Sequence, residues 1–516
     1  MIAVSEAWKE KHKQFLLPET FVEISCVITD SNVQEEAVPS ATQEDYFSST
    51  GLITIAEPKT RYATLESNLW LLDETRDIIH DEAPYTNTGY ASGISQLGSA
   101  TLTLPGVRTT AIPGVTIVWA NEFGEYAKSF TITAKNGDAV VAETTITNNT
   151  SAKTLVYLDI SNYNSVTVTI NEWCIPGRRA RIDYFLLGLD MTFDKNDLLS
   201  YTHEQHGCLV SGELPKNSIE FSINNIDSMW NPNNPEGMAR YLIERQKLTV
   251  RYGMDIDGVT EWINGGTFYL SEWYAPSNGI EASFKARDMF EFLLDVGGVG
   301  ASMNGTLTDV VNFSTESYLP EDVTVVVDPL LDTFTKVSYL GSTTHAESVQ
   351  KCANAAGCVL RPNRSNALYI EPLNTTMTDY VISLDTAYAY PEVELSKQMA
   401  SISVSYKDSE NDTPYVLDVS NVGEKQTVDN DYIITEEQAT LVAGVVRDML
   451  ESRKTISGEF RADPRLDLFD IVTVETKFGE IAPVAIATIK YTYSGSFKAS
   501  YVGRVLSGTT AAAINA

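Results

Sequence analysis

The sequence predicts a mainly β protein with a minor α+β part, in which one region is a β-sandwich. Three observations predict this fold class. Short segments of alternating apolar and polar residues recur along most of the 516 residues. Prolines and glycines separate these segments, and helix-start signals stand out at two places. With 43% apolar residues the chain can bury several cores, so about three or four domains are expected.

The first thirty residues hold one strand, expected at residues 20–28. A single strand needs partners, and we expect them far along the chain. Residues 31–45 are rich in Glu, Gln, Ser and Pro and contain few large apolar side chains, so they are interpreted as a connection. We therefore assign 1–30 to the beginning of a domain that continues later.

Seven short strands are expected between residues 46 and 189, about ten residues apart. They cover 100–104, 115–119, 129–134, 139–146, 155–160, 165–170 and 180–187. This spacing is typical of a two-sheet β-sandwich. Asn136-Gly137 lies between two of the strands and predicts a hairpin with a type I′ turn.

Residues 190–300 predict a further β domain. Ile219, Phe221 and Ile223 alternate with polar neighbours, which is typical of a half-buried strand. More strands are expected at 247–252, 266–273 and 280–287. Two prolines and a glycine within 230–237 exclude both a helix and a continuous ladder there, so a turn is expected.

The last two regions each contain one predicted helix. In 305–374, Thr344 and Glu347 form a capping box, Gly357 is placed to end the helix, and a hairpin follows at 358–371. Its apolar face is expected to hold Ala346, Val349, Ala353 and Ala356. In 379–506, Thr435 caps a helix among strands at 400–406, 470–475 and 485–493. Residues 507–516 are expected to be a flexible tail.

Several stretches of the chain resemble tail hub and baseplate proteins of bacteriophages that infect Gram-positive bacteria. The resemblance rests on "FSINNIDSMWNPNNPEG", "GGTFYLSEW", "ASFKARDMFEFL", "ESVQKCANAAGCVLRPNRSNALYIEPLN" and "GEFRADPRLDLFDIVTVET". It implies that 190–300 is a tube-like β-barrel, that 305–374 is a small α+β hub domain, and that 379–506 is a second barrel. It also implies a homotrimeric ring that continues the tail tube, with the distal tail ring, tape measure and tail fibre or spike as partners.

The segment 46–189 is similar to galactose-binding-like jelly rolls, a fold shared with carbohydrate-binding modules. The resemblance rests on the strand order and on the hairpin at Asn136-Gly137, and hub-like sequence resumes near Asp190. The jelly roll is therefore interpreted as an insert, which a surface loop accepts at little cost. It implies a host cell-wall or capsular saccharide as ligand.

Saccharides stack on aromatic rings and take hydrogen bonds from amides, carboxylates and guanidinium groups. Candidates of these types in the expected loops are Trp70, Tyr85, Asn87, Tyr90, Asn121, Glu122, Tyr126, Arg178 and Arg179. For Trp119 and Trp173, at strand ends, core packing is favoured over binding. For Arg178 and Arg179, an ion pair that stabilises the fold competes equally with binding.

The net charge of −32 comes from 37 basic and 69 acidic residues. Such a surface repels DNA and anionic membranes, so we expect no membrane partner and no specific DNA binding. A tube that lets DNA slide through fits this charge, although acidic soluble proteins are common. The sequence has no apolar run of about 18 residues and no signal segment, so assembly into the virion in the host cytoplasm is expected.

The sequence predicts no catalytic activity. The sequence contains no Gly-x-Ser-x-Gly, His-Glu-x-x-His or phosphate loop, and only five histidines. Neighbouring acids such as Glu436-Glu437 are interpreted as solvated surface or a helix start. His203-x-x-His206-x-Cys208 lacks a fourth metal ligand and is interpreted as a polar loop. The five cysteines are widely spaced and expected to be reduced. No cofactor and no metal are expected.

Two alternatives remain open. A hexameric distal-tail ring protein with the same insert differs from the trimeric hub in subunit number, which the sequence does not determine. A secreted carbohydrate-active enzyme with a binding module is disfavoured by the missing signal segment and catalytic pattern.

Overall fold

The structure is a computed structural model that describes residues 1–14, 18–29, 33, 36–41, 90–91, 98–175, 180–209, 213–276, 279–294, 302–339, 344–408 and 411–507. It divides the chain into two compact units. Unit 1 contains Met1–Ile24, Phe193–Asn234 and Ile243–Ala516, and unit 2 contains Ser25–Thr192 and Pro235–Leu242. The sequence analysis placed its insert at 46–189, within unit 2.

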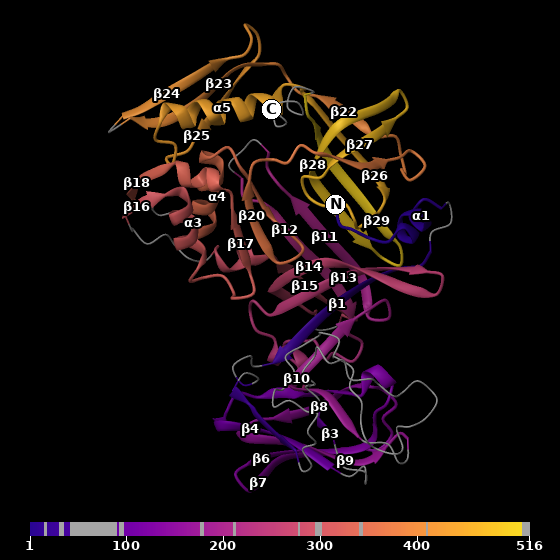
Figure 1. Cartoon of the computed structure of the whole chain (residues 1–516). Helices are drawn as coiled ribbons and strands as arrows, with labels where there is room; N and C mark the ends of the chain where they lie inside the picture. Colours follow the sequence, from indigo (N-terminus) through magenta and orange to yellow (C-terminus); the bar gives the residue numbers. More distant parts are fainter. Residues whose placement is uncertain are drawn as a thin grey trace, which may run out of the picture. The chain divides into compact units, whose positions relative to one another are not determined.

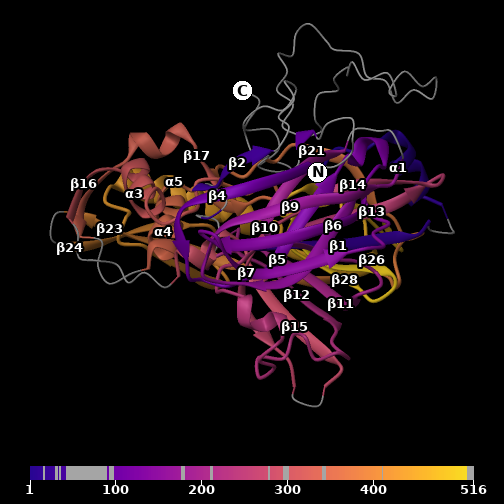
Figure 2. The same ribbon diagram turned by 90° about the horizontal axis from the view of Figure 1, so that it is seen from below.

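Unit 2 contains two sheets (Figure 1). The first has the order β2 (Val38–Ala41), β4 (Gly98–Arg108), β9 (Tyr163–Trp173), β6 (Ala127–Asn136) and β7 (Ala139–Ile146). In the second, β10 (Arg181–Phe193) pairs with β5 (Ile112–Trp119) and the short β3 (Tyr90–Ala91), and β5 pairs with β8 (Lys153–Ile160). Figure 2 shows β4, β9 and β6 of the first sheet side by side. The predicted two-sheet architecture of this region is confirmed.

Side chains from both sheets form one apolar core in unit 2. Ile132 and Val168 come from the first sheet, and Ile117 and Phe185 come from the second; all four are fully buried. In the first sheet, Ile132 and Val168 alternate with threonines, as the sequence predicted, whereas Val118 and Leu186 adjoin Ile117 and Phe185 in the second.

Two local predictions in this unit are wrong. Residues 38–41, interpreted as part of a connection, form β2, because their backbone finds ladder partners on β4. The β6–β7 hairpin forms as expected, but its central pair is Gly137-Asp138, and only Gly137 has a positive φ, at +57°. A type I′ turn requires positive φ at both central residues.

The main sheet of unit 1 follows the order β22 (Glu392–Leu395), β26 (Lys454–Arg461), β29 (Phe497–Val505), β28 (Gly479–Tyr493), β11 (Leu198–His206), β12 (Lys216–Asn224), β15 (Glu281–Arg287), β14 (Val259–Tyr274) and β13 (Lys247–Ile256). β1 (Thr20–Thr29), whose residues up to Ile24 belong to this unit, follows β13. The first predicted strand thus pairs far along the chain, as expected.

The predicted tube-like barrels are not closed. In the part of unit 1 that the structure describes, the sheet is an open path, and β22 at its end pairs only with β26. A side branch forms where β27 (Ile471–Thr476) pairs with both β28 and β21 (Met377–Ile382). Strands from the two predicted barrel regions meet in this one sheet at the β11–β28 ladder. Alternation within each segment reveals strands but not which distant strands pair.

Two smaller α/β parts complete unit 1. In the first, β16 (Ser302–Thr306) pairs with β18 (Thr335–Tyr339), and β20 (Ala367–Glu371) lies between β17 (Thr324–Val327) and β19 (Val359–Pro362). Its helices are α3 (Leu307–Thr315) and α4 (His345–Ala355). The Thr344–Glu347 capping box of α4, its four predicted apolar residues and the β19–β20 hairpin are confirmed. Gly357, just past the helix, has φ +65°.

In the second part, β23 (Met399–Asp408) lies between β24 (Asn411–Asp418) and β25 (Glu424–Asp429). The helix α5 (Glu436–Leu450) packs on this sheet (Figure 1), and Thr435 caps it as predicted by accepting from the Gln438 N–H. The N-terminal helix α1 (Glu6–His12) buries Trp8 against Met254 and Ile263.

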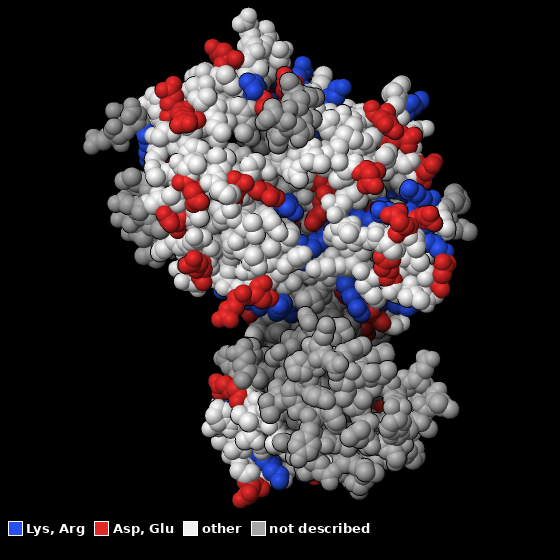
Figure 3. All heavy atoms as spheres, viewed as in Figure 1, with Lys and Arg blue, Asp and Glu red and all other residues white. Residues whose placement is uncertain are grey.

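Acidic side chains are spread over the visible face of unit 1, with Lys and Arg among them (Figure 3). No helix in the described ranges is long and apolar enough to cross a membrane.

Candidate functional site

The structure describes only part of the predicted saccharide site. Outside the described residues lie Trp70, Tyr85, Asn87, Arg178 and Arg179. Tyr90 and Glu122 are described by their backbone alone, whereas Asn121 and Tyr126 are described with their side chains.

The backbone brings four of these residues to one end of unit 2. Tyr90 and Trp119 both stand opposite Ile182 of β10. The short helix η2 (Asn121–Phe123), which includes Glu122, follows Trp119 directly. Tyr126 immediately precedes β6, and its carbonyl accepts from the Cys174 N–H just after β9 at 3.0 Å. Residues distributed over the loops of the sequence therefore converge at one place.

Two buried tryptophans pack against each other in the core at this end of unit 2. Trp119 and Trp173 are 0% and 2% exposed, and their rings meet edge to face at 5.9 Å. The Trp173 indole donates to Glu125 at 2.9 Å. Both rings therefore belong to the core, as predicted, and are not available to stack on a sugar.

The loop at this end is fixed by backbone contacts. The Asn121 N–H donates to the Asp183 carboxylate at 3.1 Å, and the Glu125 N–H donates to the Ala120 carbonyl. Asn121 exposes its amide and Tyr126 is half-buried. Such an arrangement can offer hydrogen bonds and one aromatic surface to a ligand.

The interpretation of His203, His206 and Cys208 as a polar loop is wrong for the two histidines, because they belong to β11. His203 is fully buried, and its ring nitrogens contact the Tyr252 hydroxyl and the Asn217 side-chain oxygen, each at 2.7 Å. Burial lowers the pKa of His203 to about 3, with a further lowering by Arg364. Within the described residues, no three His, Cys, Asp or Glu side chains group as metal ligands.

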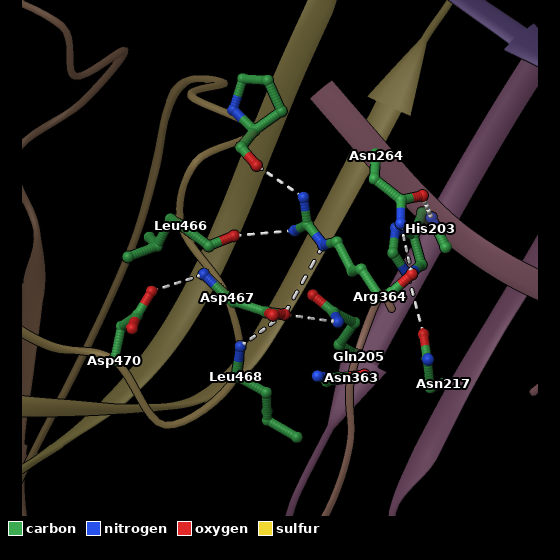
Figure 4. A network of polar contacts seen from close by, with 12 residues as sticks. His203, Gln205, Asn217, Asn264, Asn363, Arg364, Leu466, Asp467, Leu468 and Asp470 are labelled. Atoms are coloured by element: carbon green, nitrogen blue, oxygen red, sulfur yellow. Dashed lines mark hydrogen bonds and ion pairs between the residues drawn. The ribbon is translucent and has the colours of Figure 1, made fainter. Parts of the chain in front are cut away.

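A network of polar contacts in unit 1 surrounds Arg364, on the turn between β19 and β20 (Figure 4). Its side chain is 3% exposed and donates to the carbonyls of Pro464 and Leu466 at 2.5 and 2.8 Å. Its Nε lies 3.6 Å from the Asp467 carboxylate. The guanidinium also lies over the rings of Tyr252 and Tyr491, 5.7 and 5.5 Å from their centroids.

Further hydrogen bonds connect this cluster to neighbouring strands. Asn264 of β14 donates to the Arg364 carbonyl at 2.7 Å, and Gln205 of β11 donates to Asp467 at 2.8 Å. The Asp467 N–H donates to the Asp470 carboxylate at 2.8 Å. Four separate parts of unit 1 are therefore joined through one buried arginine.

A second buried ion pair lies on the turn between β26 and β27, which also holds Asp467. Asp463, which is fully buried, accepts from Arg465, and His12 of α1 lies 3.6 Å from it. Although burial acts to raise the pKa of Asp463, the charges of His12 and Arg465 lower it overall. This pair ties the N-terminal helix to the C-terminal strands.

Asp288 is buried at the start of the short helix η4 (Met289–Phe292). Its Oδ1 accepts from the Phe290 N–H at 3.0 Å, while its Oδ2 has no hydrogen-bond partner. Burial raises the pKa of Asp288 to about 7, opposed by the nearby charge of Arg287. This carboxyl therefore titrates near neutrality.

The sequence analysis missed Arg364, Asp463 and Asp467. The turns that hold them are rich in Asn, Pro and Asp, which predicts only a loop. Nothing local distinguishes a buried loop arginine from an exposed one, because its partners lie about one hundred residues away.

No protein-family model and no curated protein matches the chain. Solved structures do: the 43 kDa tail protein of prophage MuSo2 from Shewanella oneidensis is similar at 14% identity, over 61% of this chain and 95% of that one, with a TM-score of 0.44. The tail protein from Neisseria meningitidis MC58 is similar at 12%, over 61% and 95%, with 0.42. Prophage tail protein gp18 from Listeria monocytogenes EGD-e is similar at 13%, over 63% and 94%, with 0.41. These three solved structures are tail proteins.

Proposed function

We propose that this chain is a non-enzymatic structural subunit of a bacteriophage tail tip or baseplate. The proposal rests on the contacts that the buried charged groups of unit 1 make. Arg364, Asp463 and Asp467 are all engaged with backbone groups or with one another. Groups held in this way fix the segments that carry them, which favours a structural role for unit 1 over a catalytic one.

The assignment to a phage tail tip rests on the sequence segments that resemble tail hub and baseplate proteins, and not on the solved structures, whose TM-scores are below 0.5. In this assignment unit 1 forms a homotrimeric hub ring that continues the tail tube. It contacts the distal tail ring, the tape measure and a tail fibre or spike. DNA passes the ring without specific binding, because the chain carries a net charge of −32. We assign it to the virion.

Unit 2 is proposed to face outward and to bind a host cell-wall or capsular saccharide through the end that carries Tyr90, Asn121 and Tyr126. A shallow surface of this kind binds weakly, but several copies on one tail tip bind through avidity. The two-sheet architecture and the convergence of these residues support this assignment.

The ring is tested by copy number. Quantitative mass spectrometry of purified virions, together with light scattering of the purified chain, should give three copies per tail and a particle of about three times 56.8 kDa. Six copies would assign the chain to the hexameric distal-tail ring instead. One copy per tail would refute both ring assignments.

The saccharide site is tested separately. The intact chain should bind fragments of the host wall on a glycan array, and Arg178→Ala should weaken that binding. Glu143→Ala, on β7 of the same unit, serves as the control. Lack of binding to every host wall fraction would remove the receptor role and leave the structural one.

A further inference from the structure

Exposed apolar side chains are concentrated in one part of unit 1, residues 377–395, which we call the edge segment. It consists of β21, a turn and β22. The exposed apolar residues on it, with their exposed fractions, are Met377 (50%), Val381 (41%), Tyr388 (54%), Tyr390 (64%), Val393 (46%) and Leu395 (63%). Three of these residues, Tyr390, Val393 and Leu395, lie on or beside β22.

β22 is the terminal strand of the main sheet, and all four of its residues are exposed. Within the described residues, β22 pairs with β26 along one of its two edges. The Ser396 N–H donates to the Arg453 carbonyl, so the backbone groups of Glu394 and Glu392 also point toward β26. The N–H and C=O groups of Val393 and Leu395 therefore point away from the sheet, where a further strand could pair.

The side chains at this edge continue the apolar core. Val393 stands opposite Ile456, which is fully buried, so the two share one face of the sheet. Ile456 is covered by the protein and Val393 is not. An added strand would extend the core over Val393 and Leu395.

Charge decides which kind of strand fits. The edge segment contains Asp379, Asp385, Glu392 and Glu394 and no Lys or Arg. Lys454, Lys498, Arg453 and Arg465 border it. On β22 itself, Glu392 and Glu394 share one face and stand opposite the uncharged Ser457 and Thr455, so this face of the edge is acidic. A second copy of a chain with net charge −32 would bring more acid to this edge. A segment that alternates basic and apolar residues would match both faces of β22.

We propose that β22 accepts an extended basic and apolar segment of a different protein, which adds one strand to the main sheet. Backbone hydrogen bonds from Val393 and Leu395 provide the pairing, and Glu392 and Glu394 select basic side chains. This inference stands whether or not the chain forms a ring, since it rests on the geometry and charge of one sheet edge.

The test uses the full-length chain and a fluorescently labelled eight-residue peptide of alternating Lys and Val. A block peptide, four Lys followed by four Val, has the same composition but cannot place its charges on one face of a strand. Fluorescence anisotropy at moderate salt should show that the alternating peptide binds about tenfold more tightly than the block peptide. Hydrogen exchange should show new protection in fragments that contain Val393 and Leu395.

Two variants localise the binding. Leu395→Pro removes an outward N–H that β26 does not use, so the fold should persist while the affinity falls about tenfold. Glu392→Lys with Glu394→Lys should weaken binding by a similar factor. The matched control, Glu10→Lys with Glu321→Lys, makes the same charge change at exposed sites on other elements.

Equal binding of both peptides, or unchanged affinity of Leu395→Pro with an unchanged melting temperature, would overturn the proposal. Self-association of the chain that Leu395→Pro abolishes would also overturn it, because a second copy would then be the occupant of this edge.

Discussion

The interiors of the two units contain different kinds of side chains. Between the sheets of unit 2 lie apolar side chains such as Ile117, Phe130 and Val168, and its buried carboxylates Glu125 and Asp183 lie at the loop end. The corresponding interior of unit 1 contains His203, Arg364 and Asp467 beside its apolar residues. An apolar core tolerates small shifts of its side chains, whereas a buried charge is stable only while each of its partners stays in place. The stability of unit 1 should therefore depend more steeply on single polar residues and on pH.

The largest effect is expected from Arg364→Met. It removes the cation that two carbonyls and Asp467 share, and leaves Asp467 buried without its charge partner. We expect unit 1 to lose about 4 kcal/mol of unfolding free energy. Urea denaturation followed by the fluorescence of the whole chain should show an earlier transition of unit 1 only.

Arg361→Met is the matched control for this change. Arg361 lies on the neighbouring strand β19 and pairs with Glu371 at 2.8 Å, but both side chains are partly exposed. Its loss should cost no more than about 1 kcal/mol. Equal costs for the two arginines would contradict the special role of the buried cluster.

In unit 2, Trp119→Ala tests the apolar core. It deletes a fully buried ring that packs on Phe130 at 5.0 Å and on Trp173. We expect a loss of about 3 kcal/mol, because a cavity remains. The same denaturation experiment should show that the loss does not vary between pH 5 and pH 8. A strong pH dependence would mean that unit 2 also relies on buried titrating groups.

Asp288→Asn tests the pH dependence of unit 1. The folded-state pKa of Asp288, about 7, lies above the ordinary value of an aspartate, so the folded state holds a proton that the unfolded state has released. The contribution of Asp288 to the unfolding free energy is complete at low pH and is lost as the pH rises through 7. We expect the wild type to lose about 2 kcal/mol between pH 5 and pH 8 from this group.

The Asn variant keeps the cap on Phe290 and removes the titration, so its stability should be flatter over this range. Thermal melts at several pH values provide the measurement. Identical profiles for variant and wild type would show that Asp288 does not titrate between pH 5 and pH 8.

The smallest effect on stability is expected from Asn121→Ala at the loop end of unit 2. The side chain is exposed, and the bond to Asp183 comes from its backbone N–H, which Ala keeps. The unfolding free energy should change by less than about 0.5 kcal/mol. Binding to host wall saccharides should nevertheless weaken by about tenfold, which a glycan array measures. A destabilised variant would show that Asn121 supports the fold and is not free to bind.

Local patterns predicted the elements well. The strand at 20–28, the seven sandwich strands and both capped helices appear in the structure within a few residues of their predicted ends. The capping box at Thr344 and the alternation in β12 are properties of neighbours in sequence, so the sequence alone suffices to find them. Asn121 and Tyr126 lie close to the ends of β5 and β6, two strands that the sequence located correctly.

Pairing between distant segments was decided only by the tertiary structure. The sequence located β1, β12, β13, β14, β15 and β28 of the main sheet but missed β11, β22, β26 and β29. The β11–β28 ladder joins residues almost three hundred positions apart, and the described sheet is open at β22. His203 was interpreted as part of a loop, and Arg364 attracted no attention. Burial of a polar side chain depends on partners that the fold brings together, here Tyr252 and Asn217 for the histidine and Leu466 and Asp467 for the arginine. Alternation of apolar residues therefore specified many of the strands, while the long-range hydrogen bonds and charges that fix their order exist only in the folded chain.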